Sequence, residues 1–123
     1  MRGIKVTQAM TKGTDRITTV TYDTFNALIS EGQGPLVLEF MSYGCAHCRA
    51  LEPILQEIAE RVSPSMGIFR VNIGIDRELA ASFDIEGTPT LVMIENGVEV
   101  NRVEGPHPTV STLLAEITHS FEL

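Results

Sequence analysis

Apolar residues follow one another along the chain in short runs and in helical stripes, which together predict alternating strands and helices. Residues 36–41 (LVLEFM) form a nearly continuous apolar run of strand length, the pattern of a strand buried on both faces. Residues 17–20 and 67–73 are short and contain several β-branched residues, which favours strands there as well. Glu39 interrupts the 36–41 run, and an acid is out of place in a strand that is buried on both faces.

Helices are predicted where apolar residues recur every three or four positions. The stripe in residues 51–62 predicts a long amphipathic helix that begins around Cys45. We expect an earlier helix with Asp23 as its N-cap and a short one with Asp76 as its N-cap, because aspartate accepts hydrogen bonds from the free amides of a first turn. A closing helix follows over residues 110–121.

Two strands near the C-terminus are predicted to form a hairpin. Residues 90–95 and 98–103 are separated by Asn96-Gly97, a dipeptide that suits the positive φ angles of a tight type I′ turn. The element order is then βαβαβαββα. That order predicts an α/β fold with a central mixed sheet of about five strands, flanked on its two faces by about four helices.

The length of the chain limits it to one such unit. A chain of 123 residues has room for a single core, since domains commonly contain about 100 to 150 residues. Residues 1–15 show no sustained periodicity, so we interpret them as a flexible or additional N-terminal segment. Residues 16–123 are expected to form the domain.

Charge and hydropathy exclude several classes of function. Hydrophobic residues make up 43% of the chain and charged residues 20%, which is ordinary for a globular protein. Nine basic against sixteen acidic side chains give a net charge of −7, which argues against binding to nucleic acid or to an anionic membrane. No apolar run approaches the roughly 20 residues of a membrane span, and no signal peptide is evident, so a cytoplasmic location is expected.

Cysteine chemistry is the strongest functional signal. The only two cysteines occur as Cys45-Ala46-His47-Cys48 at the start of a predicted helix, a spacing that brings both sulfurs within disulfide reach. Backbone amides and the helix dipole favour a thiolate on Cys45, so we assign Cys45 as the nucleophile. Cys48, one turn further in, is expected to be more buried and to resolve the mixed disulfide by attacking Cys45.

A metal site is the alternative interpretation of the same pair. Cys45 and Cys48 could supply half of a zinc site, with the other ligands drawn from acids or from His47, His107 and His119, although no second paired motif is present. Haem attachment requires a histidine directly after the second cysteine, where this chain has Arg49.

Further motifs accompany the cysteines in a fixed order. They are an acid six residues before Cys45 (Glu39), Pro53 in the helix, the sequence Gly87-Thr88-Pro89-Thr90, Asn96-Gly97, and Gly105. With the CxxC pair, this set resembles the thioredoxin family over residues 17–121. The resemblance implies a thioredoxin-like fold and thiol–disulfide oxidoreductase activity without a cofactor beyond the Cys45–Cys48 disulfide.

The resemblance also implies roles for individual residues. Pro89 would be a cis-proline that faces the CxxC pair, and the backbone of Thr88 would pair with a substrate peptide. Glu39 would take the place of a buried aspartate that moves a proton for the second cysteine, and burial would raise its pKa. Two alternatives stay open: Glu39 could reach solvent, or an ion pair with Arg70 could hold it ionised.

The CxxC region departs from ordinary thioredoxins, which have Pro at the place of His47 and Trp at the place of Gly44. A His there resembles protein disulfide isomerases and a bacterial periplasmic oxidase. A protonated imidazole would stabilise the Cys45 thiolate and make the disulfide more oxidising, unless the His47 side chain is merely solvated. Tyr43, Gly44 and Ala46 are expected to contact the substrate together with Thr88 and Pro89.

The sequence therefore predicts a thiol–disulfide oxidoreductase that reduces or isomerises protein disulfides. The expected partners are protein thiols and disulfides and a thioredoxin-reductase-type electron donor, and the chain is expected to be monomeric. Two other classes remain as hypotheses: a non-enzymatic peptide-binding module that uses the Thr88–Pro89 groove, and a soft-metal site at the CxxC pair.

Overall fold

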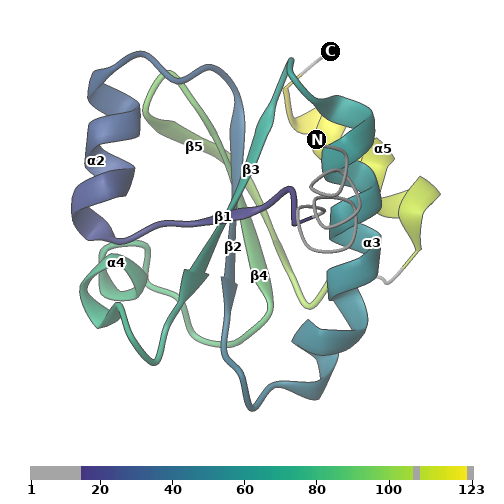
Figure 1. Cartoon of the computed structure of the whole chain (residues 1–123), viewed down its shortest axis with the longest axis horizontal. Helices are drawn as coiled ribbons and strands as arrows, with labels where there is room; N and C mark the ends of the chain where they lie inside the picture. The colour runs from purple at the N-terminus through teal and green to yellow at the C-terminus, as the bar shows by residue number, and fades with distance from the viewer. Residues whose placement is uncertain (1–14, 107–108, 122–123) are drawn as a thin grey trace, which may run out of the picture.

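A five-stranded mixed sheet forms the centre of the computed structural model, which describes residues 15–106 and 109–121. The strand order is β1-β3-β2-β4-β5, with β3 parallel to β1 and β2, and with β4 antiparallel to both β2 and β5 (Figure 1). The strands are β1 (Thr18–Thr19), β2 (Leu36–Met41), β3 (Gly67–Asn72), β4 (Thr90–Glu95) and β5 (Val98–Glu104). The predicted mixed sheet is thus confirmed.

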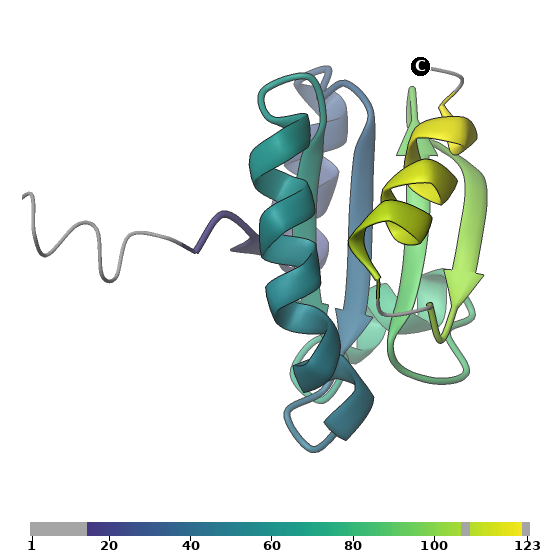
Figure 2. The same cartoon turned by 90° about the vertical axis from the view of Figure 1, so that its right-hand side faces the viewer.

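Four helices cover the two faces of this sheet. They are α2 (Tyr22–Ser30), α3 (Ala46–Val62), α4 (Arg77–Ser82) and α5 (Val110–Ser120). Helices α2 and α4 lie on one face, and α3 and α5 lie on the other, as Figures 1 and 2 show. Each side has its own apolar cluster, and Leu38 belongs to the α2 side and Leu55 to the α3 side. Both predicted faces are therefore filled.

Strand β2 supplies side chains to both clusters. All six of its residues are buried, as its continuous apolar run predicts. Since successive side chains of a strand point to opposite faces, Leu38 and Phe40 enter the α2 side while Val37 enters the α3 side. Glu39 alternates with Leu38 and Phe40, so its carboxyl lies on the α3 side, beneath the helix that carries the cysteines.

Two helix starts differ in how well the sequence predicts them. Asp76 caps α4 as predicted, because its side chain accepts a hydrogen bond from the Leu79 amide at 2.9 Å. The prediction for Asp23 is wrong, because the N-cap of α2 is Thr21. Thr21 Oγ1 accepts from the Thr24 amide at 3.2 Å and Thr24 Oγ1 accepts from the Thr21 amide at 2.7 Å. This reciprocal pair starts the helix earlier and leaves Asp23 in its first turn.

A tight turn joins β4 to β5. Asn96 and Gly97 have φ angles of 55° and 77°, which confirms the predicted left-handed turn between β4 and β5.

In the part of the chain that the structure describes, no helix is both long and apolar enough to cross a membrane. Of the predicted N-terminal segment, only Asp15 is among the described residues. His107 lies outside them.

Candidate functional site

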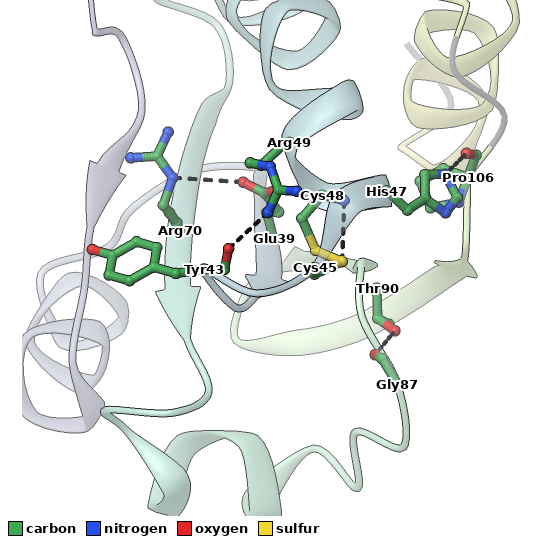
Figure 3. Close-up of a disulfide and its surroundings, with 10 residues drawn as sticks. All are labelled: Glu39, Tyr43, Cys45, His47, Cys48, Arg49, Arg70, Gly87, Thr90 and Pro106. Carbon is green, nitrogen blue, oxygen red and sulfur yellow. Dashed lines mark hydrogen bonds and ion pairs between the residues drawn. A yellow bond between two sulfur atoms is a disulfide. The ribbon is translucent and has the colours of Figure 1, made fainter.

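The two cysteines form a disulfide at the N-terminus of α3 (Figure 3). Cys45 is the N-cap residue, and its sulfur accepts a hydrogen bond from the Cys48 amide at 3.1 Å. The Cα atoms are 5.2 Å apart, so the predicted disulfide reach is confirmed. Cys45 is half-buried whereas Cys48 is only 2% exposed. A partner thiol can therefore approach the Cys45 sulfur far more easily than the Cys48 sulfur.

The loop before the disulfide is open to solvent. Tyr43 is 74% exposed, and in Figure 3 its ring points away from the sulfurs. Gly44 and Ala46 are exposed as well. An Arg49 guanidinium nitrogen donates to the Tyr43 carbonyl at 2.9 Å, which ties this loop to the first turn of α3. Three of the residues predicted to contact the substrate, Tyr43, Gly44 and Ala46, are thus exposed close to Cys45 along the chain.

The exposed His47 side chain reaches away from the disulfide to the connection between β5 and α5. Its Nε2 lies 3.2 Å from the Pro106 carbonyl oxygen (Figure 3). Because a carbonyl only accepts, Nε2 must carry a proton in this contact, in either the neutral or the cationic ring. In this arrangement the side chain links the start of α3 to the segment after β5.

The predicted cis-proline is confirmed by the cis Thr88–Pro89 peptide bond. Pro89 is buried and Thr88 is half-buried, and Thr90 Oγ1 donates to the Gly87 carbonyl at 2.7 Å. The Gly105 amide donates to the Pro89 carbonyl at 2.9 Å, so the segment that contacts His47 also holds the proline loop. An open groove of about 270 Å³ follows this loop, lined by residues 86–90 with Glu104 and Gly105.

A second cis bond, Ser63–Pro64, follows α3 and was not anticipated from the sequence. Nothing in the amino-acid pattern distinguishes this proline from an ordinary helix-ending one. It belongs to the connection between α3 and β3, at the opposite end of α3 from the cysteines.

Glu39 is fully buried, with 0% of its surface exposed. Neither of its carboxyl oxygens has a hydrogen-bond partner among the described residues. The alternative in which this side chain reaches solvent is therefore wrong. Burial raises the pKa of Glu39 to about 7, and the nearby negative charges of Glu52 and Asp15 act in the same direction.

Arg70 contacts Glu39 but is shared with two other acids. Its Nε lies 3.7 Å from Glu39 Oε1, whereas its Nη2 lies 2.5 Å from Glu52 Oε2 and its Nη1 lies 3.4 Å from Asp15 Oδ2. The cation lowers the pKa of Glu39 by less than burial raises it. The expected pairing exists, but it does not bring the pKa of Glu39 back to its usual value.

Sequence reasoning missed Glu52 and Asp15. A signal for Glu52 was present, since it follows Cys48 by four residues and so shares its face of the helix. Asp15 carries no such signal, because it reaches Arg70 from a segment 55 residues away.

The metal hypothesis finds no support in the side-chain arrangement. Among residues 15–106 and 109–121, no three His, Cys, Asp or Glu side chains gather closely enough to hold an ion. His119 is exposed in the last turn of α5. Cys45 and Cys48 are bonded to each other.

Comparisons with known proteins agree on one family. The family model described as Thioredoxin matches residues 16–119. "Thioredoxin 1" of Synechococcus elongatus is 30% identical over 72% of this chain and 83% of its own length. "Thioredoxin Y, chloroplastic" of Oryza sativa is 26% identical over 84% of this chain, and the match spans 61% of the rice protein's length.

Solved structures share the fold. A mutant thioredoxin from Halobacterium salinarum superposes with a TM-score of 0.76 at 24% identity, covering 89% of this chain and 94% of that one. Chloroplastic thioredoxin z superposes with a TM-score of 0.75 at 18% identity, covering 88% and 96% of the two chains.

Proposed function

This chain belongs to the thioredoxin family, and from that premise we propose that it reduces or isomerises protein disulfides through Cys45 and Cys48. The observation that carries the proposal is the asymmetry of the disulfide. The sulfur of Cys45 caps α3 and is partly exposed, while that of Cys48 lies buried behind it. This arrangement suits one sulfur for attack on a substrate and the other for release of the product.

In the reduced protein, the Cys45 thiolate attacks one sulfur of a substrate disulfide. The Cys45–substrate bond forms, the substrate disulfide breaks, and the first substrate sulfur leaves as a thiolate. The Cys48 amide, which donates to the Cys45 sulfur in the oxidised protein, is placed to stabilise the attacking anion. The N-cap position therefore serves the first step.

The second step releases the substrate. Cys48 gives its proton to the Glu39 carboxylate and attacks Cys45, so the Cys45–Cys48 bond forms as the mixed disulfide breaks and the second substrate thiolate leaves. In the opposite direction the Glu39 carboxyl returns the proton. A pKa of about 7 suits both transfers near neutral pH. A thioredoxin-reductase-type donor would supply the two electrons that reduce the disulfide again.

Substrates would bind along the open side of the cysteines. Tyr43, Gly44 and Ala46 are exposed next to Cys45 along the chain, and the groove beside Thr88 and Pro89 is open to an extended peptide. We expect the substrate backbone to pair with Thr88 while its sulfur meets Cys45.

Activity is tested by following reduction of insulin disulfides in the presence of dithiothreitol. Cys45→Ser should abolish catalysis. Reduced Cys48→Ser, mixed with insulin after dithiothreitol has been removed, should accumulate a mixed disulfide between Cys45 and the substrate, which added dithiothreitol then releases. Ser42→Ala, in the same loop, is the matched control and should retain the rate. Failure of Cys48→Ser to trap a substrate would contradict the proposal. A Cys45→Ser protein that keeps its cellular function would support the peptide-binding hypothesis instead.

His47 is the basis for a finer proposal on the redox potential. His47 belongs to the first turn of α3, and although its ring contacts the Pro106 carbonyl, a cationic ring there would favour the Cys45 thiolate and so the reduced protein. We expect a potential above the roughly −270 mV typical of thioredoxin. Equilibration with glutathione measures it, and His47→Pro should lower it by about 30 mV or more, a tenfold change in the equilibrium. A potential at or below that of thioredoxin would overturn the role of His47.

A cytoplasmic location, a monomeric state and a domain that begins near residue 16 belong to the same proposal. Cell fractionation tests the location, and sedimentation tests the oligomeric state. Limited proteolysis with mass analysis of the resistant fragment tests the boundary.

A further inference from the structure

Three carboxylates from three parts of the chain meet at the single guanidinium of Arg70. Glu39 belongs to β2, Glu52 to α3, and Asp15 precedes β1. We infer that Glu52, assisted by Asp15, is a positioning residue that draws Arg70 away from Glu39 and so leaves the buried carboxyl free to carry a proton. The inference rests on the proposed function of Glu39 in the second step.

Register alone would favour a close pair between Arg70 and Glu39. The two residues are direct partners in the parallel pairing of β2 with β3, so their side chains start from adjacent positions on one face of the sheet. A guanidinium and a carboxylate at such a distance can form two parallel hydrogen bonds. Neither Glu39 oxygen has a hydrogen-bond partner within the described chain, so that close pair is not formed.

The competing contacts explain why. Arg70 directs Nη2 to Glu52 and Nη1 to Asp15, and it leaves only Nε near Glu39, at 3.7 Å. Nη1 also donates to the Ile17 carbonyl at 3.4 Å. Figure 3 shows the terminal nitrogens of Arg70 turned away from the Glu39 carboxyl. The outer contacts thus fix the direction of the side chain.

The exposed fraction of these side chains increases from Glu39 outward to Glu52 and Asp15. Glu39 is fully enclosed and the Arg70 side chain is 14% exposed, while those of Glu52 and Asp15 are 34% and 57% exposed. The positive charge of Arg70 is therefore neutralised mainly by Glu52 and Asp15 on its more exposed side, where water also solvates these two carboxylates. A pocket of about 330 Å³ opens on this outer side. Cys48, Glu52 and Arg70 all line it, so solvent reaches these three residues from the same pocket.

Among the residues that the structure describes, three charged side chains shift the pKa of Glu39. Arg70 comes from β3, Glu52 from α3, and Asp15 from the segment before β1. The partner on β4 is the apolar Leu91, and Cys48 on α3 is uncharged in the disulfide. Loss of the Glu52 charge would remove its repulsion of the Glu39 carboxylate, and it would also free Arg70 to move closer to Glu39. Both changes favour the ionised form of Glu39.

The test follows Glu39 directly, without any substrate. In oxidised protein labelled with ¹³C at the glutamate side-chain carboxyls, NMR resolves the titration of Glu39, assigned by its loss in Glu39→Gln. We expect Glu52→Gln to lower the midpoint by about 1 pH unit, the effect of an opposite charge that moves close to a carboxyl. Glu52→Asp should restore part of that change, and Asp15→Asn should produce a smaller shift in the same direction.

Glu57→Gln is the matched control, because it removes the same charge from the same helix. Glu57 pairs on the surface with Arg61, and its loss should leave the Glu39 midpoint unchanged. Arg70→Gln should move the midpoint upward, since it removes the cation itself. The downward shift in Asp15→Asn keeps the test decisive if a Glu52 variant folds poorly, because Asp15 is the second acid that holds Arg70. An unchanged midpoint in folded Glu52→Gln, or an equal shift in Glu57→Gln, would overturn the inference. A correct titration pattern in a protein that reduces no disulfide would contradict the proposed function alone.

Discussion

At the scale of single residues, a carboxyl in the apolar interior is the most consequential feature. Glu39 has no hydrogen bond to offset the loss of water, so its charged form is costly and its neutral form is favoured. Sequence pattern could place this acid in a buried strand, because five apolar residues surround it in β2. It could not show how Arg70 is shared, since that depends on side chains from α3 and from the segment before β1.

Replacing Glu39 by Gln should make stability less dependent on pH. Burial raises the pKa of Glu39 from 4.5 to about 7, so the contribution of Glu39 to the free energy of unfolding falls as pH rises from about 4.5 through 7. The difference amounts to about 3 kcal/mol in favour of Glu39→Gln at pH 8, and it should nearly disappear at pH 4. Urea unfolding of the oxidised proteins at both pH values measures it.

Glu57→Gln, on the exposed face of α3, supplies the comparison for that experiment. Its unfolding free energy should track that of the unaltered protein at both pH values. A Glu39→Gln effect of the same size at pH 4 and pH 8 would show that the carboxyl is not held neutral in the fold.

At the scale of the elements, sequence pattern succeeded where burial determines the structure. Strands β2 and β4 have the predicted bounds because most of their residues are apolar and nearly all are buried. The start of α2 was predicted wrongly because helix caps depend on local hydrogen bonds, and Thr21 with Thr24 makes a better pair than Asp23 offers. The cap of α3 is Cys45, so the same position that starts the helix also presents the reactive sulfur.

Thr21→Ala should lower the free energy of unfolding by about 1 kcal/mol, the usual effect of losing an N-cap side chain. Asp23→Ala should have a smaller effect, because that side chain acts only through the dipole of the first turn. Chemical denaturation of both variants at neutral pH decides between the two caps. A larger loss for Asp23→Ala would contradict the observed capping pair.

At the scale of the whole molecule, the sheet joins two cores that lie on opposite faces. The cluster on the α3 side contains Leu55 and the cluster on the α2 side contains Leu38. The continuous apolar run at residues 36–41 and the element order predicted both layers, whereas the order of the strands within the sheet was not predicted. Sequence pattern could not bring the cis-proline loop, the end of β5 and the start of α3 together, because those contacts join distant segments.

Leu55→Ala and Leu38→Ala should each destabilise the protein by about 2 to 5 kcal/mol, since both side chains are fully buried. Because β2 contributes to both clusters, each variant should shift one common unfolding transition rather than loosen one side alone. Thermal unfolding followed by far- and near-ultraviolet circular dichroism tests this, and separate transitions for the two signals would contradict it.

The depth of Glu39 also separates two responses to ionic strength. Dissolved ions screen exposed charges beyond about 8 Å at physiological salt, but they act weakly on groups enclosed by protein. Salt should therefore weaken the long-range attraction between this acidic chain, with its net charge of −7, and cationic partners. Proton exchange at the enclosed carboxyl, which is 0% exposed, should stay nearly constant over the same range. Ionic strength should therefore change how readily a charged partner associates with this chain, while it leaves proton transfer at Glu39 nearly unchanged.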